Sequence, residues 1–279
     1  MDTQQRTILV PWDFTIVAEY AFAYAVKLSK IIGTSITLIH IVGSEKQIEA
    51  ATQRLETEKD NLKGKYNVTP HIVVIKGNIF KHISKFASET GNIELVIMGT
   101  HGIKGMQKLT GSRALKVITG SRVPYFVVQN FPTDAKFDNI IFPIDFKKEN
   151  KEKIKWAYYL CSLYHSRLYL IHTSVKDKLF RGRVYSNIEF ARKYFRNTNF
   201  KYEIVSIEKK TNFAQDVIDF SIEKNASAIL IMTSKSLTFI DYVMGPTEQF
   251  IIANSAKIPV MVVNPRKKRM EGGFSASGS

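Results

Sequence analysis

Short apolar runs alternate with longer amphipathic segments along the 279 residues of the chain. The first half opens with an apolar, β-branched run at 7–12, and apolar residues then recur at helical spacing from Val17 to Ile31. Gly33 follows this segment and is a typical helix stop. The pattern further predicts strands at 35–41, 68–75, 94–99 and 123–129, and helices at 45–63, 80–89 and 112–119.

The second half shows the same alternation. It predicts strands at 139–144, 168–172, 202–207, 228–232 and 260–263, and helices at 151–164, 188–196, 214–223 and near 248–254. Strands that alternate with helices indicate an α/β fold with a parallel sheet covered on both faces. Because crossovers are right-handed, five such strands most often take the doubly wound order 3-2-1-4-5 or 2-1-3-4-5.

The two halves also repeat one another in sequence. The run 8–14 returns 132 residues later at 140–146. Further along, an offset of 134 matches Ile97-Met98 with Ile231-Met232. A repeat of this length indicates two copies of one domain. We therefore expect tandem domains at 1–134 and 135–265, followed by a basic, flexible tail at 266–279.

Charge and cysteine content narrow the function classes. The chain carries 40 Lys and Arg against 25 Asp and Glu, and such a basic balance can attract anionic partners. Its one concentrated patch, 266–269, lies in the tail, so nucleic acid is not specifically indicated. No apolar run is long enough for a membrane span. Cys161 is the only cysteine, which excludes an intrachain disulfide and favours a cytoplasmic location. The apolar stretch around it predicts a buried thiol.

Special residues follow the strands that flank the expected reversal of the chain. Asp13 follows the first strand, the run 99–102 ends the fourth, and Gly111-Ser112 opens a helix. Glycines let a phosphate approach backbone N–H groups, and a helix start adds free donors. Asp13 can accept hydrogen bonds from a ribose or a base amine. The residues alone therefore indicate a nucleotide or phosphate site, or else a tight strand-to-helix loop.

The runs 8–14, 38–40, 96–102, 111–112 and 123–128 resemble the universal stress protein family. The resemblance spans about 5–130 and 138–264, so the chain looks like a tandem member. It implies two doubly wound, five-stranded domains of strand order 3-2-1-4-5, an adenine-nucleotide alpha-hydrolase-like fold. In nucleotide-binding members, the pattern Gly-x2-Gly-x9-Gly-Ser/Thr holds phosphates. The aspartate after the first strand and residues after the second contact adenosine.

Carried over by position, this resemblance implies a site for ATP or another adenine nucleotide, with Mg²⁺ accompanying it. His101 lies within the glycine loop, where it could face a phosphate or solvent. One departure is that eight residues, 103–110, separate the second and third glycines, where the family pattern has nine. The candidate site residues are Pro11, Asp13, Ile41, Met98, Gly99, His101, Gly102, Gly111 and Ser112.

The second copy lacks much of this signature. At the offset of 134, Thr233 and Ser236 replace the first two glycines, and Pro246 replaces the serine. Proline removes an N–H donor, although it suits the first turn of a helix. Gly245 is retained. We therefore expect the second copy to lack nucleotide and to act as a structural or regulatory partner.

Three functions remain open. The first is a stress-response regulatory protein that binds an adenine nucleotide chiefly in its first domain. The alternative is a nucleotide-independent interaction module that acts as a pseudo-dimer on an unknown protein partner. A slow ATP hydrolase has the least support, because no general base stands out and no histidine has metal-ligand spacing. Family members pair through their last strands, so 125–129 and 260–263 could pair within one chain, and a homodimer could form in addition.

Overall fold

The computed structural model describes residues 5–100, 118, 121, 123–133, 137–147, 150–208, 210–235, 242–243 and 245–264. The first half contains β1 (Thr7–Pro11), α1 (Ile16–Ile32), β2 (Ser35–Val42), a 3-10 turn (Glu45–Gln47), α2 (Ile48–Tyr66), β3 (His71–Lys76), α3 (Ile79–Glu89), β4 (Ile93–Gly99) and β5 (Tyr125–Val128). The helix expected at 112–119 lies outside the described residues, apart from residue 118.

The second half follows the same plan. Its elements are β6 (Asn139–Pro143), α6 (Asn150–Tyr164), β7 (Arg167–Thr173), α7 (Lys178–Tyr194), β8 (Tyr202–Ile207), α8 (Phe213–Glu223), β9 (Ala228–Met232), α9 (Pro246–Ile252) and β12 (Val260–Val263). A small antiparallel pair, β10 (Ser234–Lys235) with β11 (Tyr242–Val243), follows β9. None of the described helices has the length and apolar character to cross a bilayer.

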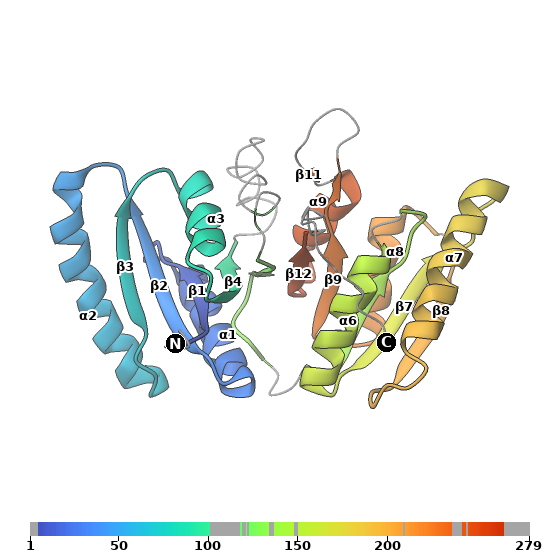
Figure 1. Ribbon diagram of the computed structural model, residues 1–279, viewed down its shortest axis with the longest axis horizontal. Helices are drawn as coiled ribbons and strands as arrows, with labels where there is room; N and C mark the ends of the chain where they lie inside the picture. The colour runs from blue at the N-terminus through green and yellow to red at the C-terminus, as the bar shows by residue number, and fades with distance from the viewer. Residues whose placement is uncertain are drawn as a thin grey trace, which may run out of the picture.

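Ten strands of the described residues form one sheet, ordered β3-β2-β1-β4-β5-β12-β9-β6-β7-β8 (Figure 1). Within each half the strands are parallel and follow the order 3-2-1-4-5, which confirms the expected fold class. The two halves join where β5 runs antiparallel to β12, with Phe126 opposite Met261. The expectation that the last strands pair within one chain is therefore confirmed.

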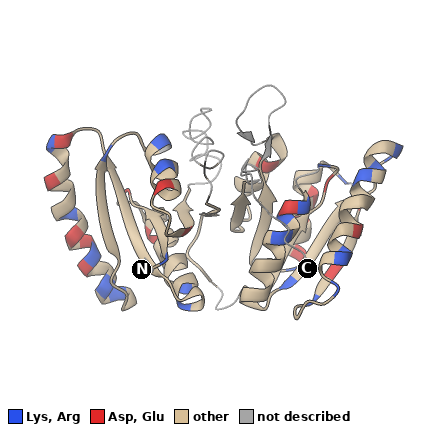
Figure 2. Cartoon of the chain, viewed as in Figure 1, with Lys and Arg blue, Asp and Glu red and all other residues tan. Residues whose placement is uncertain are grey.

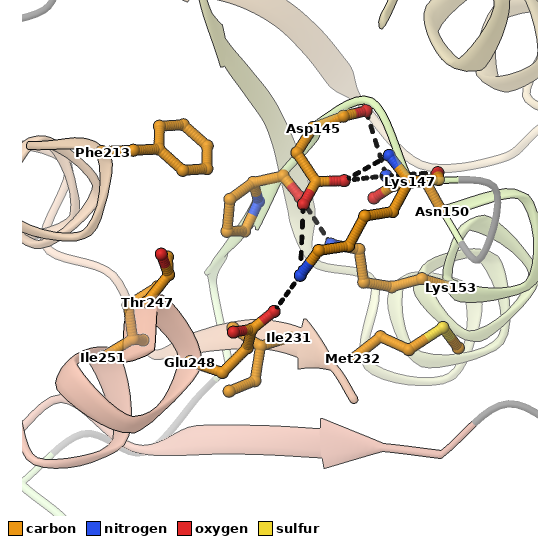
Figure 3. Close-up of a pocket in the computed structure, with 11 residues that line it drawn as sticks. Asp145, Lys147, Asn150, Lys153, Phe213, Ile231, Met232, Thr247, Glu248 and Ile251 are labelled. Carbon is orange, nitrogen blue, oxygen red and sulfur yellow. Dashed lines mark hydrogen bonds and ion pairs between the residues drawn. The ribbon is translucent and has the colours of Figure 1, made fainter. Parts of the chain in front are cut away.

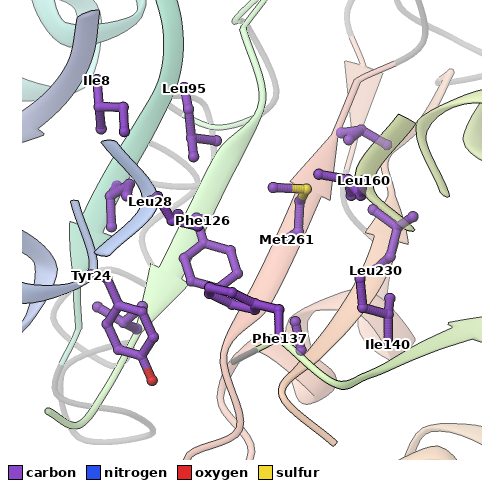
Figure 4. Packing of buried hydrophobic residues seen from close by; sticks show 14 of the residues in the cluster. Ile8, Tyr24, Leu28, Leu95, Phe126, Phe137, Ile140, Leu160, Leu230 and Met261 are labelled. Carbon is purple, nitrogen blue, oxygen red and sulfur yellow. The ribbon is translucent and has the colours of Figure 1, made fainter. Parts of the chain in front are cut away.

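The helices bury a core on each face of the sheet. One cluster packs under α1, α2, α6 and α7, and the other under α3, α8 and α9. The first cluster is continuous across the two halves, where Phe126 lies between Tyr24 and Phe137, at ring-centroid distances of 5.6 and 5.8 Å (Figure 4). Cys161 is fully buried in this cluster, as expected, and burial raises the pKa of its thiol.

Two amide side chains fasten the halves to each other reciprocally. Gln129, just after β5, donates to the carbonyl oxygens of Ile252 and Asn254, each at 3.1 Å. Asn264, just after β12, donates to those of Ile118 at 2.5 Å and Ser121 at 2.9 Å. Each amide thus extends the strand pairing by bonds to the other half, which supports a fixed pseudo-two-fold arrangement.

The sequence places the start of one helix wrongly. We expected a helix at 188–196, but α7 begins at Lys178. Asp177 caps it by accepting from the backbone N–H groups of Leu179 and Phe180, at 2.9 and 3.0 Å. The first turns are exposed and basic, so they lack the apolar periodicity that marks a helix in sequence.

We predict that Asn264→Ala lowers the free energy of unfolding by about 1–3 kcal/mol, because it leaves two carbonyl oxygens without their donors. Gln129→Ala should cost a similar amount. Urea unfolding followed by circular dichroism measures both. The control Gln215→Ala removes an exposed amide that contacts Asp219 within α8. A loss at Asn264 no larger than that of the control would refute the interface role.

Candidate functional site

The carboxyl ends of β1, β2 and β4 meet at one edge of the first half. Pro11 ends β1, Asp13 follows it, and Met98 and Gly99 end β4. Ile41 lies near the end of β2 and is half-buried. Because the order reverses between β1 and β4, this edge is the topological switch point at which doubly wound folds bind ligands. Five of the nine candidate residues therefore come together, and His101, Gly102, Gly111 and Ser112 lie outside the described residues.

The turn after β1 is held firmly. Trp12 is buried, and its carbonyl oxygen accepts from Nδ1 of His40 at 2.7 Å. Phe14 adopts a positive φ of 61°. Its ring packs on His40 and under the guanidinium of Arg54, which lies 3.7 Å from the ring centroid. These contacts fix the backbone on both sides of Asp13, and they show that His40 has a structural role.

Asp13 itself is exposed at this edge. Its Oδ1 accepts from the backbone N–H and the hydroxyl of Thr15, at 3.1 and 2.6 Å. Thr15 in turn caps α1. Within the described part of the chain, Oδ2 of Asp13 has no hydrogen-bond partner. The carboxylate is thus oriented by its own turn and still has one oxygen for a ligand.

Gly99 is required where the end of β4 passes the start of α1. A Cβ at this position would lie far inside the contact distance of the Val17 carbonyl oxygen. Backbone against backbone leaves no room for relaxation. At least one glycine of the candidate pattern is therefore explained by strand-to-helix packing.

At the equivalent edge of the second half, the aspartate makes more hydrogen bonds within the protein. Asp145 corresponds to Asp13 at the offset of 132. Its Oδ1 accepts from the backbone N–H of Lys147 at 2.9 Å and from Nδ2 of Asn150 at 2.5 Å. Its carbonyl oxygen accepts from Nδ2 of Asn187 on α7 at 2.9 Å. Asp145 is therefore occupied by its own domain.

Two lysines and a buried glutamate complete this second edge (Figure 3). Nζ of Lys147 lies 2.6 Å from Oε1 of Glu248 and 3.6 Å from Oδ2 of Asp145. Nζ of Lys153 donates to the carbonyl oxygen of Pro143 at 2.5 Å. Glu248 is only 7% exposed, and its Oε2 has no partner among the described residues. Two ammonium groups thus face two carboxylates in a small pocket.

Burial and charge act in opposite directions on the two lysines. Burial lowers the pKa of Lys153 to about 8, although the carboxylates of Asp145 and Glu248 partly offset this. Burial also disfavours the charged form of Lys147, but its hydrogen bond to Glu248 and the charge of Asp145 outweigh that effect and raise its pKa. The ion pair therefore keeps Lys147 charged.

Gly245 is retained in the second copy for a reason that the sequence did not reveal. It precedes α9, and a Cβ there would lie 2.6 Å from Oε2 of Glu248. The glycine thus admits a side-chain carboxylate of the same helix. Pro246 stands in the first turn of α9, as expected for a residue that suits a helix start.

The strand register corrects the match between the copies. Val96 pairs with Tyr125, and Ile229 pairs with Val260, so β4 and β9 correspond at an offset of 133 rather than 134. Gly99 therefore corresponds to Met232, not to Thr233. The offset is still 134 in the preceding helices, where Phe86 matches Phe220, so the second copy has one residue fewer between this point and the strand, which sequence matching of similar apolar pairs did not detect.

Sequence analysis also missed Lys147, Lys153 and Glu248. Lys153 stands where the first copy has Ala21. A lysine at a buried helix position is the signal that could have indicated this network. Among the described residues, no group of three or more acidic, histidine or cysteine side chains could hold a metal ion.

We predict that Gly99→Ala lowers the free energy of unfolding by about 1–3 kcal/mol, because the new Cβ meets rigid backbone. Gly64→Ala is the matched control, since it lies in α2 with open space around the added methyl group. That change should stabilise the helix by about 0.5–1 kcal/mol. Equal effects in chemical denaturation would contradict the packing role of Gly99.

The lowered pKa of Lys153 predicts that the stability of the folded protein depends on pH. Its pKa in the folded protein is about 8 against an ordinary 10.5, so the unfolded chain binds more protons between these values. Stability contributed by this site should therefore rise with pH from about 8 to 10.5, by at most about 1.4 kcal/mol per pH unit. Lys153→Met should lack this slope when denaturation is compared with wild type across that range. Parallel curves would count against a depressed pKa.

Comparisons with known proteins show which family and which solved structures this chain resembles. The model of the universal stress protein family matches residues 5–129. A universal stress protein from Archaeoglobus fulgidus DSM 4304 has a TM-score of 0.72 at 18% identity, covering 94% of this chain and 97% of that one. A functionally unknown protein from Pseudomonas aeruginosa PAO1 has a TM-score of 0.65 at 16% identity, covering 94% and 93%.

A universal stress protein in complex with cAMP has a TM-score of 0.37 at 16% identity, covering 46% of this chain and 98% of that one. A search of curated proteins finds no match. The two longer matches extend the fold likeness to both halves. Residues 5–129 therefore match the universal stress protein family, and the second half of the chain repeats the same fold.

Proposed function

We propose that the first half binds an adenine nucleotide, ATP or a related one, and that the chain is a cytoplasmic stress-response regulatory protein. The proposal rests on the contrast between Asp13 and Asp145. Asp13 is exposed at the switch point and keeps one oxygen without a partner in the described part of the chain. Asp145, at the same place in the second half, is held by Asn150 and Lys147.

The described residues of the first edge fit an adenosine. Oδ2 of Asp13 can accept from a ribose hydroxyl or a base amine, and the half-buried Ile41 and Met98 offer apolar surface to a base. Pro11 completes this side of the proposed site. The remaining proposed residues, His101, Gly102, Gly111 and Ser112, would contact the phosphates. Mg²⁺ bound with ATP would neutralise part of the phosphate charge.

The second half is proposed to bind no nucleotide. Its Lys147 is paired with Glu248, its Lys153 donates to the carbonyl oxygen of Pro143, and Met232 stands where the first half has Gly99. The junction of β5 with β12 favours a second candidate function, a pseudo-dimeric interaction module that works without nucleotide. The two functions differ in whether the first half has measurable nucleotide affinity.

Titration calorimetry with ATP and AMP tests this proposal on a matched pair of variants. Asp13→Ala should weaken ATP binding at least about tenfold, because a hydrogen bond to a charged group is lost. Asp145→Ala should keep the wild-type affinity within about twofold, while it lowers the unfolding temperature. Circular dichroism at the titration temperature confirms that each variant is folded.

The outcomes separate the candidates. If Asp145→Ala lost ATP affinity and Asp13→Ala kept it, the nucleotide would bind to the second half, and the proposal would be wrong. Wild-type protein that binds neither ATP nor AMP would favour the interaction module.

A further inference from the structure

The second edge is built around one carboxylate that comes from another element. Lys147 lies in the turn before α6 and Lys153 lies within α6, whereas Glu248 comes from α9 (Figure 3). Lys147 donates to Glu248 at 2.6 Å. Both lysines and Glu248 line the same pocket, whose walls include the apolar side chains of Phe213 and Ile231. The carboxylate thus has the position of a ligand of Lys147, in a pocket that Lys153 also lines.

We propose that Lys147 and Lys153 form an anion site in the second half, with the Glu248 carboxylate as its resident occupant. A small free oxyanion, phosphate or a carboxylate, takes this place when the Glu248 side chain is removed or displaced. The proposal concerns the second half alone and does not depend on nucleotide binding in the first.

The charges of the described pocket residues support this assignment. Asp145, Lys147, Lys153 and Glu248 balance to zero, so the network is neutral while Glu248 is present. Without Glu248, two ammonium groups remain against the single carboxylate of Asp145. That carboxylate is already engaged by Asn150, and it lies 3.6 Å from Lys147. The net positive charge then favours an anion in a partly desolvated pocket.

The geometry shows that Glu248 holds this place at a cost. The residue is 7% exposed, and its Oε2 has no partner in the described residues. A buried charged oxygen without a hydrogen bond is unfavourable. A Cβ at position 245 would approach Oε2 to 2.6 Å, so a larger residue there would displace the carboxylate. A free oxyanion can orient all of its oxygens, which a tethered carboxylate cannot.

Anion rescue of a cavity variant tests the proposal. Glu248→Ala should unfold at a lower temperature than wild type, because the half-buried Lys147 loses its nearest carboxylate beside the buried Lys153. Inorganic phosphate or formate should restore the unfolding temperature with a saturable concentration dependence, at ionic strength held constant with chloride. Comparing the two salts distinguishes a phosphate site from a carboxylate site. Glu223→Ala is the matched control, since Glu223 is exposed and contacts only Lys224 among the described residues.

The double variant Glu248→Ala, Lys147→Ala should lose the rescue, because one of the two cations is gone. The wild type and Glu223→Ala give the baseline for anions bound elsewhere. If Glu248→Ala does not fold, Glu248→Ser also vacates the place of the carboxylate and should show the same anion response. A response equal to the baseline, or one that persists in the double variant, would overturn the proposal.

Discussion

The antiparallel pairing of β5 with β12 is the constraint on which the rest of the molecule depends. It converts two five-stranded sheets into one sheet of ten strands and makes the apolar cluster on each face continuous across both halves. An edge strand left unpaired would expose its backbone groups, and pairing within the chain removes that exposure. Gln129 and Asn264 extend the junction beyond the strands. Each half is therefore stabilised by the other as well as by its own helices.

The two halves differ at their equivalent strand-end edges. The first edge keeps an exposed aspartate in a turn that Trp12, Phe14 and His40 hold in place. At the second edge, Lys153 of α6 stands where α1 has an alanine. The carboxylates of Asp145 and Glu248 partly offset the cost of burying its charge. A buried ion pair adds little net stability compared with apolar packing. Its presence shows that the second fold tolerates a polar interior where the first half has a candidate ligand site (Figure 2 shows how charges are distributed over both halves).

The fold could be predicted from sequence because its main signals are local and repeated. Alternating strands and helices limited the topology, and the copy of the 8–14 run located the second sheet. The start of α7 could not be predicted, because its first turns are held by the Asp177 cap and lack apolar periodicity. The offset of β9 was missed because a one-residue shift aligns similar aliphatic residues, whereas the hydrogen-bonded register distinguishes the two faces.

The candidate site was predictable only in part. Position at a strand end located Asp13 and Gly99, and residue type suggested their roles. Sequence spacing could not show that Gly99 is required by the Val17 carbonyl, or that Gly245 admits Glu248, since both depend on contacts between elements. The Lys147–Glu248 pair is 101 residues apart in sequence. No local pattern connects such residues before the sheet has formed.

We propose that one copy kept a nucleotide site and that the other closed it with its own charges. The number of ATP molecules bound per wild-type chain, measured by calorimetry at saturating Mg²⁺, tests it most directly. The account predicts a stoichiometry near one. A stoichiometry near two would contradict it, because the second edge would then accept nucleotide despite its internal ion pair.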